Sequence, residues 1–522
     1  MKTNPLKKMF FLGALALAAP ALFAGEQSPG AVSDAEIVPA KGEYVVLISE
    51  KTLKRRDWKS AAAKFVKRYN GKLVAWRGED VASAKKVLRK ISPRYVAVVA
   101  APEEIDRVFV AKLHKLSREI NDDIYGDFLW GIVTGRDGAT AGTLLGKDQP
   151  LILDRALGTT NFDQKRFKKS SFITDWGPRE YVKTENYVSS EKTAIPDNED
   201  VINVFAKHWA ENRPQFLMSA SHATEFNLEM PFGQGLIASA GTDFYLVPKR
   251  LMMDFVYTLG KEEQTKAFIK KERLKKLPKT PDEKVWFASG NCLFGDALRT
   301  PFSMVVTAIS AANVKQFVGY TVPTWFGEGG WGSSGQFFGG HQATSVGQAW
   351  FFNNQILLKN LPESVARVPV TLNPLGSDMV AMNELTRLIM AKQEKPSREL
   401  LGRLHDRDTV AFYGDPLYRA RFNPEAPSTQ PWNCTTSRNA ETRTFTVKTT
   451  RGNSYKGDFC LWFPERISAE PALCASITGG NGETEIKPDI LTENFVIFRG
   501  MELNAGEVLK LTASLAEPMR KK

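Results

Sequence analysis

Short apolar segments alternate with amphipathic ones in the first part of the chain, and this alternation constrains the fold more than any other feature. Residues 44–48, 72–76 and 95–99 are apolar enough to be buried strands, whereas residues 57–69 and 80–91 carry apolar side chains at helical spacing. Strands that alternate with helices at this spacing form right-handed βαβ units with parallel strands. The sequence therefore predicts an α/β fold built on a doubly wound, mostly parallel sheet with helices on both faces.

The chain has 522 residues, too many for a single hydrophobic core. Toward the C-terminus the pattern changes to short alternating segments separated by turn signals, which are typical of a β-sandwich. The expected parts are a signal peptide over residues 1–24, a mobile leader over 25–42, an N-terminal α/β subdomain over 43–140, a larger α/β subdomain over 141–423 and a β-sandwich over 424–522.

The N-terminus has the charged, apolar and small-residue order of a secretory signal. Lys2, Lys7 and Lys8 precede an apolar run over residues 9–23, and small residues follow. The run is short for a membrane span, although an N-terminal membrane anchor is the alternative. We expect an exported protein, periplasmic or extracellular, with no membrane span after signal removal.

The net charge is +12, but the Lys and Arg residues are scattered along predicted helices. Such a distribution is typical of a solvated surface, and no nucleic-acid-binding motif accompanies it, so we expect no nucleic-acid partner. No Walker loop, no Gly-x-Gly-x-x-Gly after a strand and no Gly-x-Ser-x-Gly is present. No cluster has zinc-ligand spacing, so no metal ligand is predicted.

The chain has four cysteines, of which Cys292 lies far from Cys434, Cys460 and Cys474. In an exported protein a disulfide is plausible in the C-terminal part, and we expect it between Cys460 and Cys474. A lone thiol such as that of Cys292 is a liability in an exported protein unless it is buried or used.

Two predicted strands end close to reactive residues. Residues 215–219 precede His222, and residues 284–289 precede Cys292. The carboxyl ends of parallel strands collect in one crevice, so the imidazole and the thiol would face each other if the strands are neighbours. An imidazole that takes the thiol proton is what nucleophilic catalysis by Cys requires. The alternative is a buried structural cysteine and an unrelated loop histidine.

Small residues beside both groups leave backbone N–H groups uncovered. The amides of Ala223 and Cys292 could form an oxyanion hole. We also expect residues 293–296 to open a helix whose N-terminus favours a thiolate.

Further stretches share their order with one known family. They are Asp122-Asp123-Ile124-Tyr125-Gly126-Asp127, Gly135-Arg136, Gly319-Tyr320-Thr321 with Trp325, and Phe412-Tyr413-Gly414-Asp415-Pro416. With the His and Cys segments, this series resembles the gingipain-type cysteine peptidases, over about residues 43–513. The resemblance implies a caspase-like fold, a C-terminal immunoglobulin-like domain, Cys292 as nucleophile, His222 as general base and a peptide or protein substrate. It implies no required cofactor. Related peptidases carry structural calcium, although no Asp-rich loop here demands it.

The chain departs from the family pattern in two places. The family has Gly directly after the His, where this chain has Ala223, and an L-residue does not freely adopt positive φ. The interval from His222 to Cys292 is also longer than the family's, which indicates an insertion between residues 225 and 279, either a lid or a longer wall of the S1 pocket.

The family also places an acidic residue before the His strand to orient the imidazole. Asp175 is the first choice and Asp163 the second; Asp163 is also a candidate substrate contact, and either is otherwise a surface carboxylate. The preferred P1 residue stays open.

The segment 325–341 is rich in Gly, Ser and aromatic residues and is either a substrate-binding wall, with Trp325 and Trp331 as contacts, or a packed surface loop. His341 is a second candidate base but has no preceding strand. We expect no chemistry from the remaining histidines, His114, His208 and His405.

Three functions remain open. The first is a cysteine endopeptidase, and the second is a non-catalytic exported binding protein that keeps the peptidase scaffold, for which Ala223 is the best support. The third is a hydrolase or transferase that uses the same dyad on a non-peptide acyl group.

Overall fold

The computed structural model describes residues 30–31, 39–240, 242–340, 344–368, 378–427, 432–449, 454–468, 473–480 and 482–516. The predicted signal peptide over residues 1–24 and His341 lie outside the described residues. Within these ranges, no helix is both long enough and apolar enough to cross a bilayer.

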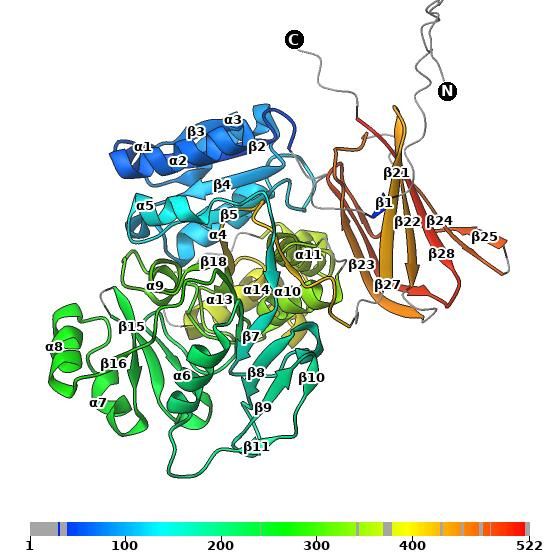
Figure 1. Cartoon of the computed structure of the whole chain (residues 1–522). Helices are drawn as coiled ribbons and strands as arrows, with labels where there is room; N and C mark the ends of the chain where they lie inside the picture. The colour runs from blue at the N-terminus through cyan, green and yellow to red at the C-terminus, as the bar shows by residue number, and fades with distance from the viewer. Residues whose placement is uncertain are drawn as a thin grey trace, which may run out of the picture.

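A large mixed sheet forms the centre of the α/β part, in the order β10-β9-β8-β7-β12-β17-β18-β19-β5-β4-β2-β3, with β11 paired to β9 (Figure 1). The α/β class and the mostly parallel sheet are therefore confirmed. The strands are β2 (Tyr44–Ser49), β3 (Lys72–Trp76), β4 (Tyr95–Val99), β5 (Leu129–Val133), β7 (Arg155–Gly158), β8 (Lys169–Ile173), β9 (Glu180–Glu185), β10 (Val188–Ser189), β11 (Thr193–Ala194), β12 (Phe216–Ser219), β17 (Lys284–Ala288), β18 (Val314–Tyr320) and β19 (Val410–Tyr413).

Apart from β9, β10 and β11, which pair antiparallel beyond β8, the sheet consists of two parallel halves that run in opposite directions. β7, β8, β12, β17 and β18 are parallel to one another, and β2 to β5 are parallel to β19. β18 and β19 pair antiparallel at the junction. The carboxyl ends of the strands in one half therefore lie at the opposite edge of the sheet from those in the other half. The predicted dyad follows strands of the β7–β18 half.

Helices that bury an apolar stripe flank the sheet. α2 buries Trp58, Ala61 and Phe65, and it ends where Asn70 adopts a left-handed conformation. α11 is buried nearly all round, and a capping box between Ser345 and Gln348 begins it. The helices are α1 (Glu50–Leu53), α2 (Arg56–Tyr69), α3 (Lys85–Ile91), α4 (Arg107–Ser117), α5 (Gly138–Ala141), α6 (Val201–Asn212), α7 (Met252–Val256), α8 (Glu262–Glu272), α9 (Met304–Ala311), α10 (Glu328–Gly339), α11 (Val346–Lys359), α12 (Glu363–Ala366), α13 (Asp378–Met390) and α14 (Arg398–Asp406).

The Gly-rich segment expected to be a wall or a surface loop is helix α10, so the loop interpretation is wrong. A Cβ atom on Gly330 would lie 2.2 Å from the Ser289 carbonyl oxygen, and one on Gly329 would lie 2.5 Å from a Val410 methyl. This helix therefore packs closer to the sheet than a helix with side chains at these positions could. Close approach here outweighs the low helix propensity of glycine.

The segment between the His and Cys loops forms a separate antiparallel sheet. Its strands are β13 (Asn227–Glu229), β14 (Leu236–Ala240), β15 (Asp243–Val247) and β16 (Lys275–Lys276). Together with α7 and α8 it encloses a small core of its own, formed by Leu236, Ala238, Val247, Leu251 and Phe255. We call residues 226–279 the insertion; Figure 1 shows it on the side of the molecule away from the C-terminal strands.

The C-terminal part consists of antiparallel sheets. One contains β21 (Trp432–Arg438), β22 (Thr442–Thr449), β24 (Leu473–Gly479), β25 (Gly482–Glu485), β28 (Val508–Ser514) and also β1 (Gly30–Ala31); the other contains β23 (Tyr455–Trp462), β26 (Ile490–Leu491) and β27 (Phe495–Leu503). β1 lies within the leader that was expected to be mobile, yet Gly30 pairs with Thr436 and Ala31 with Thr435. This expectation is therefore wrong for those two residues. β6 (Leu151–Leu153) and β20 (Ala420–Phe422) pair with each other as a parallel two-stranded sheet, and Leu153, Ala420 and Phe422 belong to the main hydrophobic core.

The three-stranded sheet packs directly on the α/β part. Arg94 is 1% exposed and donates to the carbonyls of Phe463 and Pro464. The Trp462 indole donates to the Tyr95 hydroxyl at 2.6 Å. The C-terminal strands therefore share a hydrophobic core with the parallel sheet.

The expected Cys460–Cys474 disulfide does not form, and all four cysteines are free. Cys460 lies on β23 and Cys474 on β24, which belong to different sheets. Cys460 is buried, with its sulfur 3.6 Å from Oε1 of Gln336, whereas Cys474 is exposed. Burial raises the pKa of the Cys460 thiol well above its usual range, so burial disfavours its reactive thiolate form.

The burial of His114 leads us to expect that the free energy of unfolding depends on acid pH. It is 1% exposed, and its ring lies 5.0 Å from Trp130 and 5.5 Å from Trp350, centroid to centroid. Burial lowers the pKa of His114 to about 4, whereas an unfolded chain has a His pKa of about 6.5. The contribution of the buried, neutral His114 to the free energy of unfolding is therefore fully present above pH 6.5. This contribution is lost as the pH falls toward 4, by about 1.4 kcal/mol per pH unit.

We expect the difference in unfolding free energy between wild type and His114→Gln to shrink by roughly 2–3 kcal/mol from pH 6.5 to pH 4.5, as measured by urea denaturation. A difference that stays constant over this range would contradict the assignment.

Candidate active site

The strands that precede His222 and Cys292 are neighbours. β12 pairs parallel with β17 in a continuous register from Phe216↔Val285 to Ser219↔Ala288. Both strands therefore end at the same edge of the sheet, which is the condition that the predicted dyad requires. His222 follows the end of β12 by three residues, and Cys292 follows the end of β17 by four.

The loops that carry His222 and Cys292 are in contact, and hydrogen bonds of the buried side-chain amide of Asn291 join them. A Cβ atom on Gly290 would lie 2.8 Å from the Cβ of Ala220, so a side chain there would push the loops apart. The Asn291 side chain is fully buried; it accepts a hydrogen bond from Ser219 Oγ and donates one to the Ser221 carbonyl, each at 2.5 Å. The residue before Cys292 is thus bonded to the residue before His222.

The Cys292 sulfur is partly buried and has a backbone donor. The Thr324 N–H, in the loop after β18, lies 3.3 Å from Sγ. A hydrogen bond to sulfur is stronger when the sulfur is negatively charged. The expected helix over residues 293–296 is absent, because α9 begins only at Met304. The donor on the sulfur is therefore a loop amide, not a helix N-terminus.

The chain after Cys292 is held in an unfavourable conformation. Leu293, Leu298 and Arg299 all have positive φ, at 61°, 45° and 54°. Such conformations cost free energy in non-glycine residues and persist only where the surrounding structure imposes them. Here the Leu293 N–H donates to the Val322 carbonyl at 3.2 Å, and the Gly295 N–H donates to Tyr320 at 2.8 Å.

His222 is exposed, and its backbone is held by a short antiparallel turn. The Glu229 N–H donates to the His222 carbonyl at 2.8 Å, and the Thr224 N–H donates to Asn227 at 2.9 Å. Among the described residues, the imidazole has no hydrogen-bond partner. The residue is therefore exposed to solvent, on the loop that contacts the Cys292 loop.

The two predicted oxyanion donors have no protein acceptor in the described part of the chain. Ala223 and Leu228 form an antiparallel bridge flanked by the two bonds above, so the Ala223 N–H points away from its partner. Within the described ranges, neither the Ala223 amide nor the Cys292 amide donates to a protein oxygen. Ala223 is not among the residues with positive φ. Its side chain therefore causes no backbone strain where the family has glycine.

A buried arginine connects the two loops from a third element. Arg107, at the start of α4, lies 3.1 Å from Asp296 and 3.3 Å from Glu225. Glu225 follows His222 by three residues, and Asp296 follows Cys292 by four. Burial raises the pKa of Asp296 to about 7, although the Arg107 cation opposes the shift. One cation therefore holds both loops.

Within the described ranges, neither predicted acid is hydrogen-bonded to the imidazole. Asp175 follows β8, which β7 separates from β12, and its carboxylate accepts a hydrogen bond from Thr160 Oγ1 at 2.6 Å. Asp163 accepts from the Lys165 N–H at 3.2 Å, and its other oxygen lies 3.7 Å from Arg166. No hydrogen bond between His222 and either acid is present in the described part of the chain.

Trp325 and Trp331, the predicted substrate contacts, are 48% and 39% exposed. Trp325 directly follows Thr324, the donor to the Cys292 sulfur. Trp331 lies in the first turn of α10. Both indoles are therefore accessible on the loop and helix that follow β18.

Sequence reasoning missed Asn291, Thr324 and Arg107. Asn291 had a signal, since it directly precedes the candidate nucleophile. Thr324 and Arg107 had none, because their roles depend on contacts with segments distant in the chain. Among the described residues, no three His, Cys, Asp or Glu side chains are grouped so that they could hold a metal ion.

No family model and no curated protein matches the chain. Among solved structures, a GH30 endoxylanase from Clostridium papyrosolvens C71 is 7% identical with a TM-score of 0.13, covering 91% of this chain and 96% of that one. A β-arabinopyranosidase is 9% identical with a TM-score of 0.12, covering 91% of this chain and 57% of that one. These TM-scores are too low to say anything about fold or activity.

Proposed function

We propose that the protein is an exported cysteine endopeptidase with a caspase-like arrangement, in which Cys292 is the nucleophile and His222 its acid–base partner. One observation carries the proposal. β12 and β17 are adjacent parallel strands, and the loops that bear His222 and Cys292 touch at Gly290 and are joined through Asn291.

In the proposed reaction, His222 takes the thiol proton and the Cys292 sulfur attacks the scissile carbonyl carbon. The carbonyl oxygen becomes negative and accepts hydrogen bonds from the Ala223 and Cys292 amides. The imidazolium of His222 then protonates the leaving amine, and the C–N bond breaks to leave a thioester. A water molecule, deprotonated by His222, then attacks the thioester carbon to give a tetrahedral intermediate. When this intermediate collapses, the C–S bond breaks, the carboxylic acid leaves and the sulfur regains its proton from His222.

Thiol labelling tests the proposal with an internal control. Cys474 is exposed, whereas Cys434 and Cys460 are buried, so Cys474 reports the reactivity of an ordinary accessible thiol. We expect a peptidyl chloromethyl ketone to label Cys292 at least about tenfold faster than Cys474, because in the proposed dyad the His222 imidazole accepts the thiol proton as the sulfur attacks the label. Peptide mapping by mass spectrometry after timed quenching gives both rates. In His222→Gln the advantage of Cys292 is expected to vanish.

The alternative is a non-catalytic exported binding protein on the same scaffold. The observation that favours it is that, among the described residues, no carboxylate is hydrogen-bonded to the His222 ring; the Asp175 carboxylate accepts its hydrogen bond from Thr160 Oγ1. In that case Cys292 reacts no faster than Cys474, and His222→Gln changes neither rate.

A further inference from the structure

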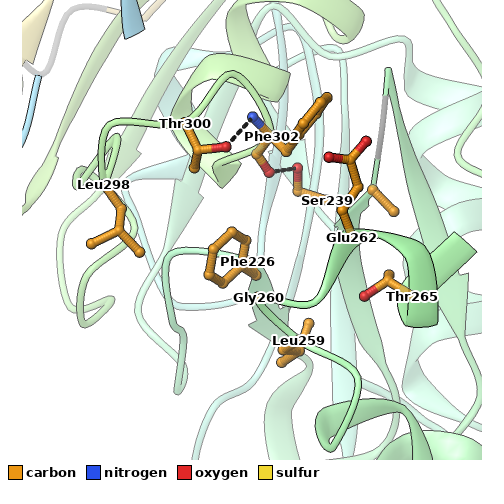
Figure 2. Close-up of a pocket in the computed structure, with 10 residues that line it drawn as sticks. Phe226, Ser239, Leu259, Gly260, Glu262, Thr265, Leu298, Thr300 and Phe302 are labelled. Carbon is orange, nitrogen blue, oxygen red and sulfur yellow. Dashed lines mark hydrogen bonds between the residues drawn. The ribbon is translucent and has the colours of Figure 1, made fainter. Parts of the chain in front are cut away.

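A cavity of about 290 Å³ lies between the insertion and the segment that follows Cys292. From the His side its wall includes Phe226, four residues after His222, and from the Cys side Leu298, six residues after Cys292. The full lining is Phe226, Ser239, Ala240, Leu259, Gly260, Glu262, Thr265, Leu298, Thr300 and Phe302 (Figure 2).

The hydroxyl groups of this cavity are already engaged by the protein. Ser239 Oγ donates to the Phe302 carbonyl at 2.5 Å, and Thr300 Oγ1 accepts from the Phe302 N–H at 3.3 Å; Figure 2 shows both bonds along one wall. Thr265 Oγ1 donates to the Thr258 carbonyl at 2.7 Å. The hydroxyl protons of Ser239 and Thr265 are therefore already donated within the protein, and these two residues add their carbon atoms to the wall.

The single ionisable group in the lining is also paired. Glu262 is on the first turn of α8, and its carboxylate lies 2.5 Å from Lys266 Nζ one turn later. Both members of this pair are exposed to solvent, at 39% for the Glu262 side chain and 48% for the Lys266 side chain, so water screens the charge of the carboxylate. The aromatic and aliphatic side chains of Phe226, Leu259, Leu298 and Phe302 favour an apolar group over an ion.

The volume matches one side chain better than a whole ligand. Small-molecule sites commonly measure about 300–1,000 Å³, so a cavity at the lower end of that range accommodates a single large residue. Both loops that carry the proposed dyad continue directly into its wall, and the Met304 N–H donates to the Glu225 carbonyl at 2.7 Å where they meet.

We infer that this cavity is a specificity subsite that receives a large apolar side chain, such as Leu, Met or Phe, from a residue flanking the scissile bond. The inference rests on the proposed peptidase function and adds its substrate class. The insertion then acts as a wall of the substrate site, contributed by β14, the turn before α8 and α8 itself.

The test is cleavage of a peptide library whose products are sequenced by mass spectrometry. Wild type is expected to select a large apolar residue at one position beside the cleaved bond, with a kcat/KM about 10- to 100-fold above that for Ala there. Leu259→Glu places a carboxylate in the cavity and should remove this preference and favour Lys or Arg at the same position. Ala240→Leu fills the cavity without charge and should shift selection to Ala or Val.

Tyr257→Glu is the matched control, because Tyr257 lies in the same turn, is 71% exposed and does not line the cavity. Its selection should equal that of wild type. If wild type cleaves peptides without preference, or prefers charged residues, the subsite is wrong while the peptidase stands. If the preference is apolar but survives in both cavity variants, the subsite lies elsewhere. If wild type cleaves nothing and Cys292 shows no enhanced labelling, both proposals fail.

Discussion

Cys292→Ala is expected to lower kcat/KM toward peptides by at least about 10³-fold, since neither covalent catalysis nor its acid–base partner can act without the sulfur. The Cys292 side chain is only partly buried and, among the described residues, its one hydrogen bond comes from the Thr324 N–H. The substitution should therefore change the melting temperature by no more than about 4 °C. Progress curves with a cleaved library peptide, together with thermal unfolding, measure both quantities.

Cys474→Ala controls for thiol loss, because Cys474 is exposed and outside the site. This variant should retain full activity. His222→Ala should lose about 10²- to 10⁴-fold, the range usual for a general acid–base group. Peptide turnover by Cys292→Ala at the wild-type rate would exclude Cys292 as the nucleophile.

Arg107→Met is expected to destabilise the fold by about 3–5 kcal/mol at pH 8, as is usual when one member of a buried ion pair is removed. Arg107 is 7% exposed and Asp296 fully buried, so the Asp296 carboxylate would be left without its nearest cation. The loss should show as a lower urea midpoint in equilibrium unfolding. Because Glu225 is released as well, the His222 loop should also become more sensitive to proteolysis.

The pH dependence of this variant has a definite sign. Burial already raises the pKa of Asp296 to about 7, so this group favours the folded state at low pH and the contribution is lost as the pH rises through 7. Without Arg107 the carboxyl can protonate more readily, and the cost of the substitution should be smaller at pH 6 than at pH 8.

Lys112→Met is the control for Arg107→Met, because Lys112 is also on α4 and its ion pair with Asp80 is exposed on both sides. Exposed pairs contribute about 0–1 kcal/mol. Equal effects of the two substitutions at pH 8 would mean that the buried cation does not hold the loops.

The strands of the parallel sheet could be predicted from the sequence, because each is a run of apolar residues between polar segments. β3 and β4 have the predicted bounds, and β12 and β17 differ from the prediction by one residue each. The antiparallel junction between β18 and β19 was not predicted. A buried strand is apolar whichever direction its neighbour runs. The apolar residues of β18 therefore do not indicate whether β19 runs parallel or antiparallel to it.

Local patterns failed where tertiary contacts outweigh them. Residues 328–339 contain enough glycine to indicate a loop, yet they form α10 because the sheet beneath accepts only glycine at Gly329 and Gly330. Residues 293–296 looked like a helix start, yet contacts with Val322 and Tyr320 hold them in a loop with Leu293 at positive φ.

By itself, the sequence determined where strands lie and that His222 and Cys292 each follow one, since apolar periodicity is a local property that burial imposes directly. Only the tertiary structure decided that these two strands are neighbours, that Asn291 and Arg107 hold their loops, and that Asp175 bonds to Thr160. Such pairings depend on which buried polar groups can be satisfied together once the core has formed, and spacing along the chain does not encode that choice.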